Sequence, residues 1–341
     1  MFALVHGPWP RATIDGVDLA ALEADVAAGR LDPAELRVAT ERLVAEVVAA
    51  QVDAGIELVT DGQVRWPDLG RAVATALAGD AGPATLVDAW RATQALTDRP
   101  VAQAMPGPYS LGFDAGGEAP MRAERTRALA DALAVEVRAL AEAGCPVVLV
   151  EEPRAVDVGE DAVERDLFLD AQRRLLAPVP DLHAMLVVSG GSAHLAGPDT
   201  ILGAPYRSFL FDLIEGPDNW YLVRATPGDR GVVCGALRVS EPPPGDQAPL
   251  LVWAAGYAAS TAGRGTERVG LANATPLRDL SPATAHALVR ELGRGARLAA
   301  MDPRDAVKAG LDPRTFSQPP SRTGGGRRPT KAPGRSRGRS R

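Results

Sequence analysis

Eight short apolar runs recur along this chain of 341 residues, and most of them stop at a glycine, proline, acid or amide. They are the segments Phe2–Val5, Ile56–Thr60, Val101–Ala104, Val147–Val150, Ala184–Val188, Ser208–Ile214, Gly231–Leu237 and Arg268–Leu271. The stretches between them are rich in Ala, Leu and Arg at helical spacing, as in Leu129, Leu133, Val137 and Leu140. Alternation of buried strands with helices predicts an α/β fold with a parallel sheet, and eight such units predict a closed (β/α)8 TIM barrel.

Length and charge distribution divide the chain into a barrel and a tail. One barrel needs roughly 250 residues, so we expect a single barrel over residues 1–312, with a few insertions. Residues 317–341 hold eight Lys or Arg and no acid, with almost no apolar residue, which predicts a disordered basic tail over 313–341. Such a tail suits a solubilising extension. The alternative is an arm for nucleic acid or an anionic surface, but no aromatic residue lies between the arginines, so a nucleic-acid partner is not expected.

The cysteines and the apolar segments indicate in which cellular compartment the protein works and whether it contacts a membrane. The two cysteines, Cys145 and Cys234, cannot build a disulfide framework, and no Cys/His cluster along the sequence indicates a metal site. The N-terminus lacks a basic region followed by a long apolar stretch, and no later segment has the roughly 18 apolar residues of a membrane span. We therefore expect a soluble, cytoplasmic protein without a membrane partner.

Polar and charged residues gather where the predicted strands end. Parallel barrels hold their chemistry at the C-terminal ends of the strands, and ionisable groups there are costly unless they are paired or used. The cluster therefore predicts a site for a small polar or zwitterionic molecule. Its alternative is a set of helix caps and surface ion pairs. The residues concerned are His6, Arg11, Asp61, Arg65, Asp68, Glu151, Glu152, Arg154 and Glu215.

Adjacent residues on a strand point in opposite directions, so only one of Glu151 and Glu152 is expected to face the cavity. This arrangement weakens a mechanism that uses the two carboxylates as a pair.

Five of these segments, in this order, resemble the C-terminal catalytic barrel of the cobalamin-independent methionine synthases and its short single-barrel relatives. The opening His6-Gly7-Pro8-Trp9-Pro10-Arg11 resembles that family's Gly-Ser-Phe-Pro-Arg. The similar segments further along are Gly55–Gln63 (Gly-Ile-Asp-…-Asp-Gly-Glu in the family), Gly107–Leu111 (its Gly-Pro-Val-Thr turn), Val150–Pro153 (Ile-Asp-Glu-Pro) and Val269–Ala274 (the final strand). The resemblance extends over nearly everything before residue 312 and implies a divergent single-barrel member.

The resemblance implies a zinc ion bound by His, Cys, Glu and Cys, which in that family lowers the pKa of the homocysteine thiol so that the thiolate can take a methyl group. Three of the four positions differ here. The His-x-Cys at the end of the fifth strand reads Val187-Val188-Ser189, and the last Cys is replaced by Ala274. Glu215 is the one matching ligand, so we expect no metal site and no cofactor, and zinc-dependent methyl transfer that is absent or weak. His194 with Glu215 and Asp61 is a minor alternative metal site.

The positions that contact the substrate in that family differ less from this sequence than the zinc positions do. The family's Glu after Asp-Gly and its Asp before Glu-Pro contact the substrate amino group, and these positions are Gln63 and Glu151 here. The resemblance and the strand ends together give Glu215 and Asp61 as catalytic candidates. The substrate-binding candidates are His6, Arg11, Gln63, Arg65, Ser110, Glu151 and Ser189.

Three functions stay open from the sequence. The first is a methyltransferase of the methionine biosynthesis type, which acts on homocysteine or another thiol with 5-methyltetrahydrofolate or a methylcorrinoid as donor. The second is a metal-independent enzyme of another reaction class on the same barrel. The third is a non-catalytic member that binds a small molecule, such as an amino acid or thiol.

Overall fold

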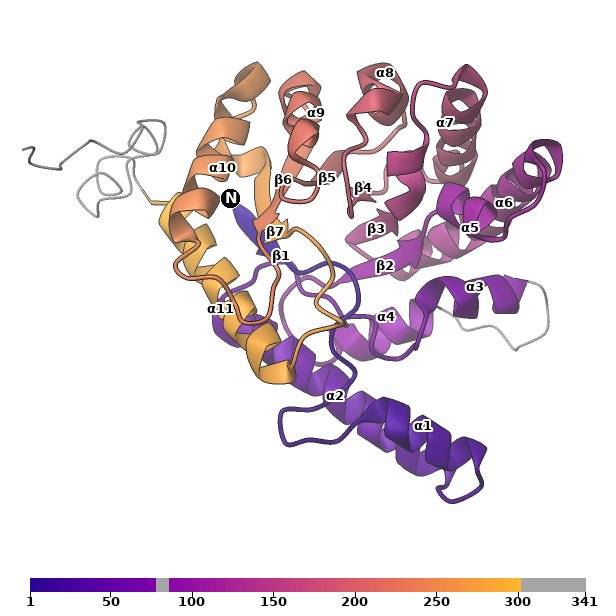
Figure 1. Cartoon of the computed structure of the whole chain (residues 1–341), viewed down its shortest axis with the longest axis vertical. Helices are drawn as coiled ribbons and strands as arrows, with labels where there is room; N and C mark the ends of the chain where they lie inside the picture. Colours follow the sequence, from indigo (N-terminus) through magenta and orange to yellow (C-terminus); the bar gives the residue numbers. More distant parts are fainter. Residues whose placement is uncertain (78–85, 302–341) are drawn as a thin grey trace, which may run out of the picture.

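The computed structural model describes residues 1–77 and 86–301, and within them seven parallel strands form one curled sheet. Their order across the sheet is β1-β7-β6-β5-β4-β3-β2, and helices surround it (Figure 1). The α/β class and the parallel sheet are confirmed. The strands are β1 (Phe2–Leu4), β2 (Ala102–Pro106), β3 (Val147–Glu151), β4 (Ala184–Val188), β5 (Ser208–Asp212), β6 (Gly231–Leu237) and β7 (Val269–Asn273).

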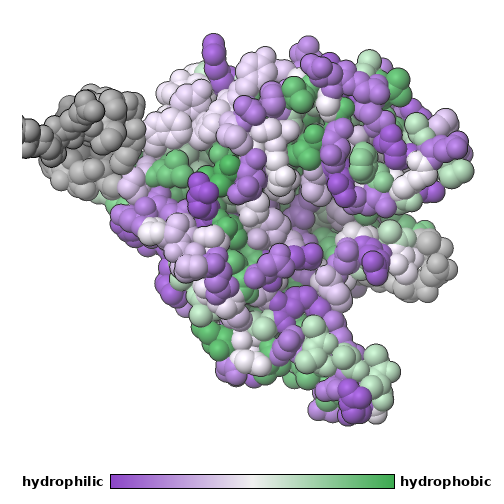
Figure 2. Space-filling model, viewed as in Figure 1, coloured by the Kyte–Doolittle hydropathy of each residue, from purple (hydrophilic) through white to green (hydrophobic). Residues whose placement is uncertain are grey.

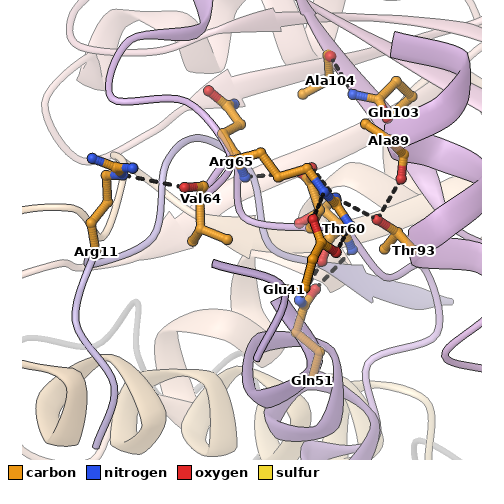
Figure 3. A network of polar contacts seen from close by, with 12 residues as sticks. Arg11, Glu41, Gln51, Thr60, Val64, Arg65, Ala89, Thr93, Gln103 and Ala104 are labelled. Atoms are coloured by element: carbon orange, nitrogen blue, oxygen red, sulfur yellow. Dashed lines mark hydrogen bonds and ion pairs between the residues drawn. The ribbon is translucent and has the colours of Figure 1, made fainter. Parts of the chain in front are cut away.

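The run Ile56–Thr60, expected to be the second of the eight strands, is not a regular strand. It lies between β1 and β2 and makes one parallel bridge to each, Leu4 with Leu58 and Val59 with Val101. Side chains replace the missing ladder bonds: the Gln51 amide bonds both the N–H and the carbonyl of Thr60 at 3.1 and 2.8 Å (Figure 3). The parallel pairing therefore continues from β1 to β2 through two isolated bridges.

The helices lie between successive strands and cover the outside of the sheet. The long α2 begins where Asp32 accepts a hydrogen bond from the N–H of Ala34, with Pro33 in its first turn, and ends at Gly55 in the left-handed region (φ 83°). The hairpin of α1 and α2 projects from the body of the molecule (Figure 1). The helices are α1 (Leu19–Ala27), α2 (Pro33–Ala54), α3 (Leu69–Leu77), α4 (Leu86–Gln94), α5 (Pro108–Asp114), α6 (Ala119–Ala143), α7 (Ala162–Leu176), α8 (Pro198–Ile201), α9 (Trp220–Ala225), α10 (Ala248–Ser260) and α11 (Pro282–Ala299).

The core lies inside the curled sheet and between the sheet and the helices. Every residue of β2, β4, β5 and β7 is buried, which explains why these strands read as continuous apolar runs rather than alternating ones. Polar and apolar residues are mixed on the outer face that Figure 2 shows. Among the described residues, no helix combines the length and the apolar character that a bilayer crossing requires.

The expected end of the barrel at residue 312 and the tail 313–341 lie outside the described residues. The last helix, α11, begins as the sequence predicts, because the Ser281 hydroxyl accepts a hydrogen bond from the N–H of Thr284 and Pro282 occupies the first turn.

Candidate functional site

A cavity of about 330 Å³ opens among the loops that follow the strands. Its walls come from the loops after β1, after the Ile56–Thr60 segment and after β2, β3, β4 and β7, so it lies at the C-terminal end of the sheet, where parallel barrels place their sites. The lining residues are His6, Gly7, Pro8, Gln63, Asp68, Leu69, Gly70, Pro106, Ser110, Leu111, Asp114, Glu151, Pro153, Ser189, Pro276 and Arg278.

Glu151, the last residue of β3, places its carboxyl group in this cavity. Its Oε1 accepts hydrogen bonds from the backbone N–H of Gly7 at 3.1 Å and from Nε2 of Gln63 at 2.8 Å. Burial raises the pKa of Glu151 from the ordinary 4.5 to about 6, while these two donors partly offset the rise. Among the described residues Oε2 has no hydrogen-bond partner, so this oxygen can bind a ligand.

Gln63 reaches Glu151 from a strained turn. It is a non-glycine residue in the left-handed region (φ 57°), and it follows Gly62, which is also left-handed (φ 63°). Such backbone conformations persist where surrounding contacts enforce them, often next to functional sites. Asp61 supplies one of these contacts, because its Oδ1 accepts the backbone N–H of Gln63 at 2.9 Å.

Asp61 does not line the cavity. It is buried, and its Oδ2 accepts a hydrogen bond from the guanidinium of Arg65 at 3.1 Å. Burial raises the pKa of Asp61, and the charge of Arg65 opposes the rise. Arg65 is itself fixed by the carboxylate of Glu41 and the hydroxyl of Thr93 (Figure 3). Asp61 and Arg65 therefore support the turn that presents Gln63 to the cavity.

The two adjacent glutamates take opposite directions, as the strand alternation predicts. Glu152 is fully buried and accepts hydrogen bonds from the N–H groups of Tyr109 and Ser110, from the Ser110 hydroxyl and from the Gln172 amide. It thus caps the start of α5. A Cβ at Gly107 would lie 2.1 Å from the Glu152 carboxyl carbon, so only glycine permits this close approach.

His6 lies in the cavity wall after β1 and is held by Asn273 at the end of β7. Nε2 of His6 is 2.9 Å from the backbone carbonyl of Asn273, which can only accept, so this nitrogen carries the hydrogen. The Asn273 side chain in turn bonds the backbone N–H and carbonyl of His6. Burial lowers the pKa of His6 to about 4, and the imidazole is therefore neutral at pH 7.

Arg278 is the cation of the cavity. Its side chain is exposed, and its one hydrogen bond within the described residues is a long one, 3.5 Å, to the carbonyl of Pro67. Its charge opposes the rise in the pKa of Glu151. The sequence reasoning missed Arg278 because it follows β7 by five residues, beyond the strand end itself.

Five of the nine predicted site residues line the cavity, namely His6, Gln63, Ser110, Glu151 and Ser189. The other four lie outside it, and they are Arg11, Asp61, Arg65 and Glu215. Arg11 makes a two-bond ion pair with Glu23 at 2.7 and 2.8 Å.

Glu215 is exposed, three residues beyond the end of β5. The residue at that strand end is Asp212, whose buried carboxylate accepts the N–H groups of Gly190, Ile214 and Glu215. Asp212 thus joins the loops after β4 and β5, and it was missed because the apolar run continues past it to Ile214.

The residues present do not fit a zinc ion. Val187, Ser189 and Ala274, at three of the positions that the resemblance assigns to ligands, offer two hydrocarbon groups and one hydroxyl, whereas zinc takes thiolate, imidazole and carboxylate. Over residues 1–77 and 86–301, no three His, Cys, Asp or Glu side chains come together in a way that could hold a metal ion. His194 is the histidine of the minor alternative site with Glu215 and Asp61. It lies beside Asp218, with 3.9 Å between Nδ1 and Oδ2, and belongs to no such group in the described part of the chain.

Comparison with solved structures finds this fold in methionine synthases. The chain is similar to a B12-independent methionine synthase from Shewanella sp. W3-18-1 in complex with selenomethionine, with a TM-score of 0.71, 15% identity and coverage of 90% of this chain and 98% of that one. It is also similar to a vitamin B12-independent methionine synthase candidate from Listeria monocytogenes, with a TM-score of 0.67, 14% identity and coverage of 89% and 100%. A third similar structure is a methyltransferase from Methanosarcina mazei, with a TM-score of 0.56, 14% identity and coverage of 87% of this chain and 94% of that one.

Neither a protein-family model nor a curated protein sequence matches the chain. At these identities the structural likeness shows the fold, and the resemblance read from the five sequence segments is confirmed at that level.

Proposed function

We propose that the chain is a divergent member of the methionine synthase-like methyltransferase lineage that binds a small amino acid or thiol-bearing amino acid in the cavity at the C-terminal end of the sheet. The observation that carries this proposal is the presence of both Glu151 and Arg278 in the lining of one cavity. A carboxylate with one free oxygen suits an ammonium group, and an exposed guanidinium without a carboxylate partner among the described residues suits a carboxylate. The fold shared with methionine synthases supports the lineage.

We infer that any chemistry in this cavity would proceed without zinc, and the donor set described above supports this inference. We infer that the protein's own groups bind and orient the substrate: Gln63 and the Gly7 N–H hold Glu151, and Asn273 fixes the His6 ring. A free thiol has a pKa of about 8.5, so methyl transfer to it without a bound cation would be slow at neutral pH. Zinc-dependent transfer from a folate or a corrinoid is therefore expected to be absent or weak.

A second candidate function is metal-independent acid–base catalysis of another reaction class. It is favoured by the pKa of Glu151, about 6, because a carboxyl group near neutrality can both hold and release a proton under physiological conditions. Glu151 would act alone, since Glu152 is committed to the start of α5.

Calorimetric titration with methionine and two truncated analogues tests the binding proposal. The analogue without the carboxylate, 3-(methylthio)propylamine, removes the partner of Arg278, and 4-(methylthio)butanoate removes the partner of Glu151. We expect methionine or homocysteine to bind and both analogues to bind at least about tenfold more weakly, because each leaves a charged group of the cavity without its counterpart. Binding by neither amino acid would refute the proposal.

Matched variants connect such binding to this cavity. Glu151→Gln should weaken amino-acid binding, whereas Glu160→Gln, the same change at an exposed glutamate outside the cavity lining, should not. A methyl-transfer assay with 5-methyltetrahydrofolate and methylcobalamin, run beside metal analysis of the protein, separates the candidate functions. Transfer that needs stoichiometric zinc would contradict the cavity described here.

A further inference from the structure

A second cavity, of about 530 Å³, lies at the opposite end of the sheet, where the strands begin. It is formed by the residues that precede β4, β5, β6 and β7 and by the start of β1, so it shares no lining residue with the cavity described above. Its volume falls in the range of small-molecule sites. The residues that carry the argument are Phe2, Pro180, His183, Arg207, Arg230 and Arg268.

Three arginines stand at equivalent places around this cavity. Arg207, Arg230 and Arg268 each come directly before a strand, β5, β6 and β7 respectively. These strands are neighbours in the sheet. Ser208 is in register with Gly231, and Val269 is in register with Val232, so Arg230 lies opposite Arg207 and Arg268 is offset by one position. Since adjacent strands are about 4.8 Å apart, Arg207 and Arg230 bring two like charges close together, which is unfavourable without an anion nearby. Arg268 adds a third arginine to the lining of the same cavity.

The carboxylates nearby only partly neutralise these charges. Arg207 is 3.7 Å from the fully exposed Asp181, and Arg268 is 3.8 Å from Glu267, which is 71% exposed. Long ion pairs between exposed groups contribute little and are easily exchanged for another anion. Asp229, which is also exposed, lines the cavity as well, so the carboxylates near the three guanidinium groups, Asp181, Asp229 and Glu267, are all exposed.

Arg230 has a structural task as well. One of its nitrogens donates to the carbonyls of Leu202 and Ala204 at 2.6 and 3.1 Å, and the guanidinium lies 5.7 Å from the centre of the Phe209 ring. These contacts fix Arg230 in the cavity wall. Arg207, which donates to the carbonyl of Pro180 at 3.2 Å, and Arg268 are each about half exposed, so both can adjust to a ligand more easily than Arg230.

The rest of the wall is apolar or uncharged. Phe2, Pro180 and Pro205 supply rigid apolar surface. His183 and Ser208 are bonded to each other, with 2.8 Å between Nε2 and Oγ, and both burial and the charge of Arg207 lower the pKa of His183. The wall thus offers hydrogen-bonding groups without a further charge.

We propose that this cavity binds a small organic phosphate, with the phosphate group among Arg207, Arg230 and Arg268 and an apolar body against Phe2, Pro180 and Pro205. Arginine forks suit phosphate oxygens because they donate two parallel hydrogen bonds. This site is independent of the function proposed for the other end of the sheet.

Titration of the full chain with phenyl phosphate, inorganic phosphate and benzoate tests the proposal by calorimetry. Phenyl phosphate should bind, and both inorganic phosphate, which lacks the apolar body, and benzoate, which lacks the phosphate group, should bind several-fold more weakly. No binding of phenyl phosphate at millimolar concentration would overturn the proposal. Equal binding of phenyl and inorganic phosphate would also overturn it, because the site would then hold an adventitious ion only.

Two double variants locate the site. Arg207→Gln with Arg268→Gln should weaken phenyl phosphate binding by about tenfold or more, since two charge-assisted contacts are lost. Both side chains are about half exposed, so we expect this double variant to fold. Arg37→Gln with Arg138→Gln makes the same change of charge on the exposed faces of α2 and α6 and should bind as the unchanged protein does. Arg278→Gln, in the other cavity, should also leave this binding intact. Unchanged binding in the first pair would overturn the assignment.

Discussion

Replacement of Glu151 by glutamine should make the folded protein more stable at pH 7 while it weakens ligand binding. Burial raises the pKa of Glu151 from 4.5 to about 6, so the folded chain holds this proton more tightly than the unfolded chain does. The stability from this group is then highest below pH 4.5 and falls as the pH rises through about 6. A shift of roughly 1.5 units corresponds to at most about 2 kcal/mol at pH 7.

Glutamine avoids this cost and keeps the local geometry. Its side-chain oxygen can still accept from the Gly7 N–H and from Nε2 of Gln63, which bond Oε1 of Glu151, and no charge remains to be desolvated. Urea unfolding of both proteins between pH 4.5 and 8 checks the argument. The difference in free energy of unfolding should be near zero at pH 4.5 and grow to about 1–2 kcal/mol in favour of the variant at pH 7. A difference that does not change with pH, or a less stable variant at pH 7, would refute it.

Three further predictions concern two residues that support the cavity and the effect of metal removal. Asp61→Asn should weaken ligand binding several-fold through Gln63, because Arg65 loses the carboxylate oxygen of Asp61 and the turn that presents Gln63 is held less firmly; titration with the amino acid tests this, and unchanged affinity would contradict it. Gly107→Ala should destabilise the protein by about 2 kcal/mol or more, because the new methyl group would overlap the Glu152 carboxyl; unchanged thermal unfolding would contradict this. Dialysis against EDTA should leave the melting temperature unchanged, and a drop of several degrees would reveal a metal site that the described residues do not explain.

Much of the fold could be predicted from apolar runs because strands buried on both faces leave that signal directly in the sequence. Seven of the eight runs overlap a strand of the described structure. The exception, Ile56–Thr60, is also mostly apolar, but its polar side chains hold its pairing together with the backbone. Glu57 accepts the N–H of Ala3, and the Thr60 hydroxyl donates to the carbonyl of Val5. Such long-range side-chain bonds have no local pattern, so periodicity cannot reveal them.

The sequence predicted the place of the cavity at the strand ends better than it predicted which residues line it. Residues directly at strand ends, such as His6 and Glu151, line the cavity because the strand itself directs them there. Arg11 was placed by proximity along the chain, but its long side chain pairs with Glu23, twelve residues away in the sequence. Arg278 was missed because it lies five residues beyond the end of β7, in a loop that nevertheless lines the cavity.

The contacts that hold Glu151 lie apart from the strand ends to which the resemblance assigns most of the zinc ligands. Glu151 is held by Gln63 and Gly7, and Gln63 is held in turn by Asp61 and its partner Arg65. None of these contacts involves the ends of β4 and β5, where the resemblance places most of the zinc ligands. The loops after those two strands are joined instead by the Asp212 carboxylate. The positions that the resemblance assigns to zinc at the ends of β4 and β5 therefore lie outside the contacts that hold Glu151, so different residues at those strand ends leave these contacts in place.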